Sequence, residues 1–140
     1  MAKVLTDFKV VPIKGAIGPS YLTITQKALK FNADTYALLG SPSYIRFLVK
    51  EAASQVAIQP CDYDEKTSIP FSYTKGKRAH PIAVREIAFL TAVSRLLPLW
   101  KDGKPVTYRV KGEYFPEENV LVYDLKDATE YSPQSSRKNL

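Results

Sequence analysis

Basic side chains are the residues of this sequence whose type and spacing point to a chemistry. Lys75, Lys77 and Arg78 stand within four positions around a glycine, in a segment that has the composition of a turn. Cations this close together can neutralise successive phosphates of a nucleic-acid backbone. Arg109 and Lys111 lie two positions apart in a predicted strand, so both project from the same strand face. These two groups together predict a phosphate-binding surface.

A second basic pair occurs in the first half of the chain. Arg46 and Lys50 are four positions apart in an alternating segment, which places them on one strand face. If the two halves of the chain are related by a pseudo-twofold axis, this pair and the Arg109/Lys111 pair occupy equivalent positions. We therefore predict a nucleic-acid-binding set that consists of Lys75, Lys77, Arg78, Arg109, Lys111, Arg46 and Lys50.

Residues of the kind that carry catalysis or bind metals are sparse. The single histidine, His80, has no Ser or Cys signature beside it, and we interpret it as a surface residue or one at a helix start. The single cysteine, Cys61, cannot form an internal disulfide and has no partner at metal-ligand spacing. The sequence also lacks a glycine-rich phosphate loop. We therefore expect no enzyme, no catalytic residue, no metal site and no cofactor.

Composition and charge narrow the class of protein. The chain has 140 residues, of which 45% are hydrophobic, enough for one compact domain or two small modules that share a core. It has neither an apolar stretch of the ~20 residues that span a bilayer nor a signal pattern, so we expect a cytoplasmic protein without membrane contact. The net charge of +6 is uneven, because residues 75–111 carry nine Lys and Arg against two acidic residues. Such a local excess attracts phosphate backbones.

The elements predicted for the first half are strands, one short helix and a hairpin. Alternating or β-rich residues predict strands at Lys3–Ile13, Tyr21–Thr25, Tyr44–Lys50 and Gln55–Gln59. Asn32 is typical of an N-cap, and it predicts a helix over Ala33–Leu39 that ends at Gly40. The polar and acidic residues 61–70 have the composition of a linker or exposed loop.

The same order of elements is predicted again in the second half. Patterning predicts a strand at Phe71–Thr74, a helix over 82–97, a strand at Thr107–Glu113 and a returning strand at Val120–Leu125. The helix is apolar nearly all round, which predicts packing on more than one side. Residues 132–140 have the composition of a disordered tail.

These elements predict an α+β fold, mostly β, made of two strand–helix–hairpin units. The first unit covers residues 1–60, the acidic linker 61–70, the second unit 71–131 and the tail 132–140. A unit of this size is marginal alone, so the two units are expected to share one core.

The order of strand, short helix and hairpin resembles a known family. The strand ending in Ile24-Thr25, the helix end Leu38-Leu39-Gly40 and the hairpin of Tyr44–Val49 and Gln55–Pro60 resemble the AbrB/SpoVT swapped-hairpin transcription factors. Two units in one chain are similar to the tandem MraZ arrangement. The resemblance implies DNA binding and transcription regulation. The segments 29–32 and 39–44 are also similar to small uncharacterised proteins of Gram-positive phages and mobile elements, which adds an accessory or anti-defence role.

The leading prediction is a transcriptional regulator of a phage or mobile element that binds double-stranded DNA through a basic face. A homodimer is one expected form of this regulator. The alternative is a non-enzymatic protein-binding module, such as a phage-encoded, anti-CRISPR-like inhibitor of a host defence nuclease. That alternative predicts a contiguous exposed apolar or aromatic patch for a host protein. Small-ligand binding in a pocket between the units is a third reading.

Overall fold

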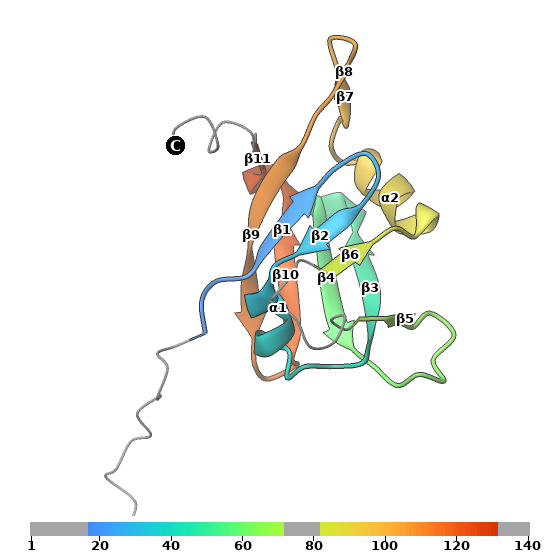
Figure 1. Cartoon of the computed structure of the whole chain (residues 1–140), viewed down its shortest axis with the longest axis vertical. Helices are drawn as coiled ribbons and strands as arrows, with labels where there is room; N and C mark the ends of the chain where they lie inside the picture. Colours follow the sequence, from blue (N-terminus) through green and yellow to red (C-terminus); the bar gives the residue numbers. More distant parts are fainter. Residues whose placement is uncertain (1–16, 72–81, 132–140) are drawn as a thin grey trace, which may run out of the picture.

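The computed structural model describes residues 17–71 and 82–131, which form a curled antiparallel β-sheet and two short α-helices (Figure 1). The first half contains β1 (Tyr21–Ile24), β2 (Leu29–Phe31), α1 (Ala33–Leu38), β3 (Tyr44–Lys50), the 3-10 helix η2 (Glu51–Ala53), β4 (Gln55–Pro60) and β5 (Ile69–Pro70). The second half contains β6 (Ile82–Val84), α2 (Ile87–Ser94), β7 (Trp100–Lys101), β8 (Lys104–Pro105), β9 (Tyr108–Phe115), β10 (Val120–Asp124), the 3-10 helix η3 (Leu125–Asp127) and β11 (Thr129–Glu130). The predicted class, α+β and mostly β, is confirmed. In these two ranges no helix has the length and apolarity needed to cross a bilayer.

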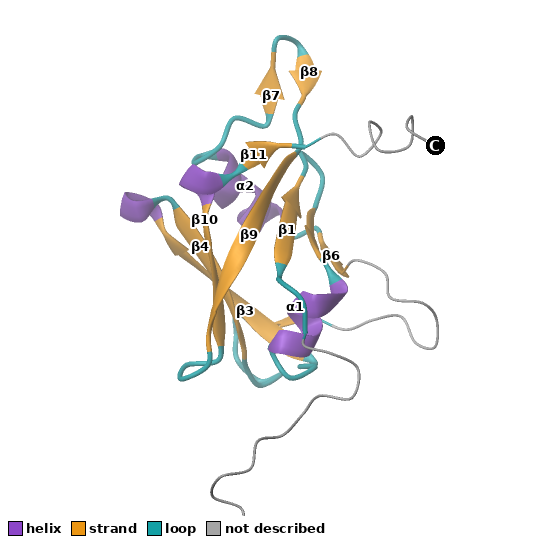
Figure 2. Cartoon of the chain, turned by 90° about the vertical axis from the view of Figure 1, so that its left-hand side faces the viewer, coloured by secondary structure: helices purple, strands orange, loops and turns teal. Residues whose placement is uncertain are grey.

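The sheet follows the strand order β5-β3-β4-β10-β9-β1-β2-β6, and β11 also pairs with β9. Strand β9 joins its two parts, because residues 108–111 pair with β1 whereas residues 112–115 pair with β10. Strands β1 and β4 of the first predicted unit thus pair with β9 and β10 of the second, and β5 lies within the predicted linker. The unit boundaries themselves stay a prediction. The separate hairpin of β7 and β8 projects beyond the sheet (Figure 2).

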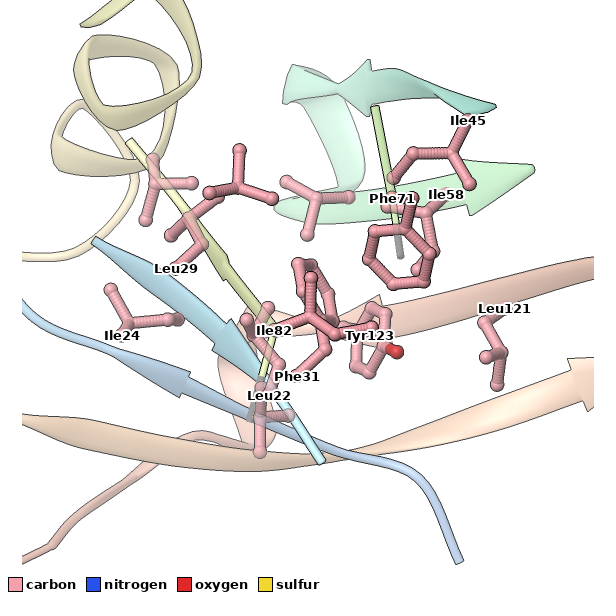
Figure 3. Close-up of a cluster of buried hydrophobic side chains, with 14 of the residues drawn as sticks. Leu22, Ile24, Leu29, Phe31, Ile45, Ile58, Phe71, Ile82, Leu121 and Tyr123 are labelled. Carbon is pink, nitrogen blue, oxygen red and sulfur yellow. The ribbon is translucent and has the colours of Figure 1, made fainter. Parts of the chain in front are cut away.

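The curl of the sheet encloses an apolar core (Figure 3). Strand alternation sends one face of each strand inward, so that Leu22 and Ile24 of β1 are fully buried. The Phe31 ring on β2 contacts the rings of Phe71 and Tyr123, with centroids 5.6 and 5.9 Å apart. These contacts place the core between β1 and β2 on one side and β3 and β4 on the other.

Gly112 lies where β9 changes its pairing partner. A Cβ atom at this position would lie 2.6 Å from Cε2 of the Tyr123 ring on β10, its direct neighbour in the sheet. Because real Cβ contacts are longer than this, the ring can lie over the β9 backbone only where the strand carries glycine. The position where β9 changes its pairing partner is therefore also the position where the largest fully buried side chain, Tyr123, packs against its backbone.

A chain of buried hydroxyl groups links β10 to the start of α1. The Tyr123 OH lies 2.7 Å from Ser20 Oγ, which lies 2.6 Å from Thr35 Oγ1, and Thr35 donates to Asn32 Oδ1 at 2.7 Å. Each hydroxyl has one proton, so Ser20 donates to Thr35 and Tyr123 donates to Ser20. Asn32 is the N-cap residue, as predicted, but its Oδ1 accepts from the Tyr21 N–H and the Thr35 hydroxyl rather than from a helix amide.

The helix predicted over 82–97 is wrong at both ends, because α2 spans only Ile87–Ser94. Ile82 and Val84 belong to β6, where they pair with β2 and are both buried, and α2 begins only at Ile87. Their spacing of two is the strand period, and the pairing with β2 satisfies their backbone groups. Packing of the helix on more than one side is also wrong, since Val93 is the one fully buried residue of α2 and Ile87 is 78% exposed.

The other described elements lie close to their predicted positions. The strands at 21–24, 44–50, 55–60, 108–115 and 120–124 and the helix at 33–38 are confirmed, with ends that differ from the prediction by two residues at most. The strand predicted at Phe71–Thr74 is not present at Phe71, which follows β5. Residues 72–74, the strand predicted at Lys3–Ile13 and the tail 132–140 lie outside the described residues.

Candidate nucleic-acid interface

Arg109 and Lys111 lie on the outer face of β9. Their neighbours Tyr108 and Val110 are buried in the core, so alternation turns both cations toward solvent. Thr23 of β1 is the register partner of Arg109, and the Lys111 position pairs with Tyr21 at the start of β1. The cations therefore sit over the β1–β9 pair.

Two tyrosine rings hold the Arg109 guanidinium. Its Cζ atom lies 3.9 Å from the centroid of Tyr21 and 5.0 Å from that of Tyr131. Arginine stacked on aromatic faces gains cation–π energy while its N–H donors at the ring edges remain available. Within residues 17–71 and 82–131 Arg109 forms no ion pair, so its charge is not cancelled by a carboxylate at contact distance. The arrangement presents an oriented guanidinium to an anion.

Arg46 on β3 is held differently. Its Nε and Nη2 atoms both donate to Gln59 Oε1, at 3.0 and 2.7 Å, and Nη1 lies 3.7 Å from a carboxylate oxygen of Glu65. Most of its donors are therefore used within the protein. Lys50, at the end of the same strand, lies beside the exposed apolar residues Leu48 and Val49.

The seven predicted residues are brought together only in part. Arg109 and Lys111 are adjacent on β9, whereas β3, with Arg46 and Lys50, is separated from β9 by β4 and β10. The remaining three predicted residues lie outside the described residues: Lys75, Lys77 and Arg78. A nucleic-acid role for any of the seven stays a prediction.

A cleft of about 1000 Å³ lies between the outer face of β1 and β2 and the projecting β7–β8 hairpin. Three lysines line it, Lys30 from β2 and Lys101 and Lys104 from the hairpin. Tyr131, which stacks on Arg109, lines the cleft as well, so the guanidinium stands at its border. We call this cleft, with Arg109 at its border and Lys111 beyond Arg109 on the same face of β9, the basic cleft.

Cations exceed carboxylates in the basic cleft. Glu130 lies 2.9 Å from Lys101 Nζ, and its hydrogen bond raises the pKa of that lysine above the ordinary value. Asp102 occupies the hairpin turn. In the described part of the chain, no ion pair engages Lys30, Lys104, Arg109 or Lys111. Unpaired cations on the walls of a concave surface concentrate a positive field there.

Sequence reasoning missed the β7–β8 hairpin, although a local signal for it exists. Asp102 and Gly103 form the two-residue turn, with φ of +52° and +76°. Asp-Gly is the dipeptide that favours such left-handed turn positions and predicts a tight hairpin. The outward position of Lys30 also had a local signal. Lys30 stands between the core residues Leu29 and Phe31, and this alternation predicts a strand with the lysine on its exposed face.

The tyrosines of β9 and β10 are packing residues and not free stacking surfaces. Tyr108 is buried and donates to the Pro98 carbonyl at 2.9 Å, and Tyr123 has no exposed surface. Tyr114 is half-buried and donates to Asn119 Oδ1 at 2.7 Å. The aromatic rings that border the basic cleft are instead Tyr21 and Tyr131.

Comparison with protein-family models, curated proteins and solved structures gives no match to this chain. The resemblance to swapped-hairpin transcription factors therefore stays a prediction. In the described ranges no cluster of three His, Cys, Asp or Glu side chains is arranged to hold a metal ion.

Proposed function

We propose that the protein is a DNA-binding protein that holds backbone phosphates in the basic cleft, in the role of a regulator encoded by a phage or mobile element. One observation carries the proposal: cations from three separate segments gather around one cleft without a carboxylate partner. They are Lys30 from β2 and Lys104 from the β7–β8 hairpin on the walls of the cleft, and Arg109 from β9 at its border, with Lys111 beyond Arg109 on the same strand face.

The chemistry of the cleft suits a phosphate backbone. The Arg109 guanidinium, oriented by Tyr21 and Tyr131, can donate two parallel hydrogen bonds to one phosphate. Lys30 and Lys104 act as point charges toward its neighbours, and the hydroxyl of Thr23 adds a donor on the cleft wall. Such contacts position a nucleic acid without reading its sequence, and both a duplex and a single strand offer the phosphates for them.

Salt dependence and charge removal test this proposal. Anisotropy of a labelled oligonucleotide is measured at about 50 mM and about 200 mM salt, and four neutralised phosphates give a log–log slope of about −3 to −4. Arg109→Ala and Lys104→Ala are expected to weaken binding severalfold and to reduce the slope by about one unit each.

Lys66→Ala provides the matched control. This lysine is exposed in the acidic loop between β4 and β5, so the substitution removes the same charge outside the basic cleft. If it weakens binding as much as Arg109→Ala does, the net charge of the protein and not the cleft drives association, and the proposal is wrong.

A protein-binding module is a second candidate, and a different surface favours it. Leu48, Ala57 and Val122 lie side by side on β3, β4 and β10 and form an apolar strip beside a hollow of about 170 Å³. Leu48 is 38% exposed. Exposed apolar surface of this kind is typical of interfaces. A complex that forms through the strip would be lost in Leu48→Glu and retained in Lys104→Ala.

A further inference from the structure

A second hollow, of about 470 Å³, lies between α2 and the β7–β8 hairpin. Its apolar walls are Ile87 and Leu90 of α2 together with Leu99 and Trp100. Ile87 is 78% exposed and Trp100 is 56% exposed, which is unusual for two large apolar side chains that face one hollow. We call it the tryptophan hollow.

The tryptophan hollow and the basic cleft are built on the same two elements. Thr25 lines the cleft and Gln26, the next residue in the β1–β2 turn, lines the hollow. Trp100 lines the hollow and Lys101, the next residue of β7, lines the cleft. In Figure 1 the hairpin rises above the β1–β2 turn, with α2 beside it. Because successive residues of a strand project to opposite faces, the hollow and the cleft flank the hairpin on different sides. A flexible strand that crosses the hairpin can therefore place an apolar group in the hollow and a neighbouring anion in the cleft.

The rim of the tryptophan hollow is polar. Gln26 offers an amide with two donors and an acceptor, and Thr91 of α2 offers a hydroxyl. A flat ring that stacks on an indole and an aliphatic wall while its edge meets such groups has the chemistry of a nucleobase. A purely apolar peptide would leave the neighbouring Lys104, which forms no ion pair in the described residues, without matching charge.

We propose that the tryptophan hollow holds an unpaired nucleobase stacked on Trp100, with the phosphates of the same strand in the basic cleft. The inference rests on the proposed function and adds the class of nucleic acid, which is single-stranded. Bases in a duplex are stacked on their neighbours and paired at their edges, so they cannot enter the hollow. Preference for a single strand over a duplex follows.

The single tryptophan of the chain gives a direct readout, because all indole fluorescence comes from Trp100. Three probes of equal length, about 12 positions, are compared: oligo(dT), the same strand with abasic sites, and a duplex. Oligo(dT) is expected to quench Trp100 and to bind about 5- to 50-fold more tightly than the abasic strand, since base stacking adds to the shared phosphate contacts. The duplex is expected to bind as the abasic strand does.

Substitution of Trp100 separates stacking from charge. Trp100→Ala is expected to lower oligo(dT) affinity to that of the abasic strand and to leave abasic binding unchanged, whereas Trp100→Phe retains part of the preference. Tyr63→Ala is the matched control, because Tyr63 is an aromatic residue 75% exposed in the loop between β4 and β5. Circular dichroism of each variant verifies folding.

The outcomes distinguish the two proposals. Equal affinity for oligo(dT) and the abasic strand without quenching would overturn the base site while phosphate binding stands. Duplex binding as tight as oligo(dT) binding would overturn it as well. If no probe binds at about 50 mM salt, the proposed function fails and the base site fails with it. Quenching of Trp100 by a leucine- and glutamate-rich helical peptide, but by no oligonucleotide, would make the hollow a protein-docking surface.

Discussion

Replacing Ser20 with alanine is expected to destabilise the fold by about 2–4 kcal/mol. The Tyr123 hydroxyl has no exposed surface and donates to Ser20 Oγ, so the substitution leaves a buried donor without an acceptor, which costs about 1–3 kcal/mol. Loss of the Ser20–Thr35 hydrogen bond adds about 1 kcal/mol.

Tyr123→Phe is expected to cost less, about 1 kcal/mol, because Ser20 keeps its donation to Thr35 and loses only an incoming bond. The double variant Ser20→Ala/Tyr123→Phe no longer contains the Tyr123 hydroxyl that lacks an acceptor in Ser20→Ala. The double variant is therefore expected to be destabilised by about 1–2 kcal/mol less than the sum of the two single substitutions.

Urea unfolding followed by far-UV circular dichroism measures all three costs, and an unchanged m-value shows that the variants unfold from comparable native states. Strict additivity, or a Tyr123→Phe variant as unstable as Ser20→Ala, would refute the order of donors along the chain of hydroxyl groups.

Three further outcomes are expected. Gly112→Ala should destabilise by about 2–4 kcal/mol in the same urea assay, because its Cβ would collide with the Tyr123 ring at 2.6 Å. Alanine at an unhindered strand position is about 0.5–1 kcal/mol more stable than glycine, so a neutral or stabilising effect would contradict this contact. Burial raises the pKa of Tyr123 above its ordinary 10.0, so the unfolded chain loses this proton at a lower pH than the folded protein does. The free energy of unfolding should therefore fall above about pH 10, by up to about 1.4 kcal/mol per pH unit. Tyr123→Phe should flatten this fall, and an equally steep fall in the variant would contradict the assignment to Tyr123. Glu130→Gln should tighten oligonucleotide binding about threefold at low salt by releasing Lys101, as anisotropy would show, and unchanged affinity would place Lys101 outside the bound surface.

The strands were predictable because their alternation is local. In Tyr44–Lys50, Ile45 faces the core and Arg46 faces outward. This alternation can be recognised from the segment alone, without knowledge of its partner strand. Residues 82–84 were not predictable in this way, because three residues beside a helical segment fit both the strand period of 2 and the helix period of 3.6. Only their pairing with the distant strand β2 makes them a strand.

The candidate site was predictable at Arg109 and Lys111 and missed elsewhere. A shared strand face follows from spacing, but the basic cleft exists because the β7–β8 hairpin lies over β1 and β2, and no local pattern shows which surface a hairpin covers. The engagement of Arg46 by Gln59 and Glu65 depends likewise on the partner strand and a distant loop.

The pairing of β9 has a consequence for the synthesis of the chain. Tyr21 pairs with Lys111 and Gln55 with Asp124, so the early strands β1 and β4 have these sheet neighbours only after the ribosome has released the final hairpin. Contacts so distant along the chain close slowly. A nascent chain that stops before β9 would leave one edge of β1 and one edge of β4 without a pairing partner, and chaperone binding is expected to end when β10 emerges.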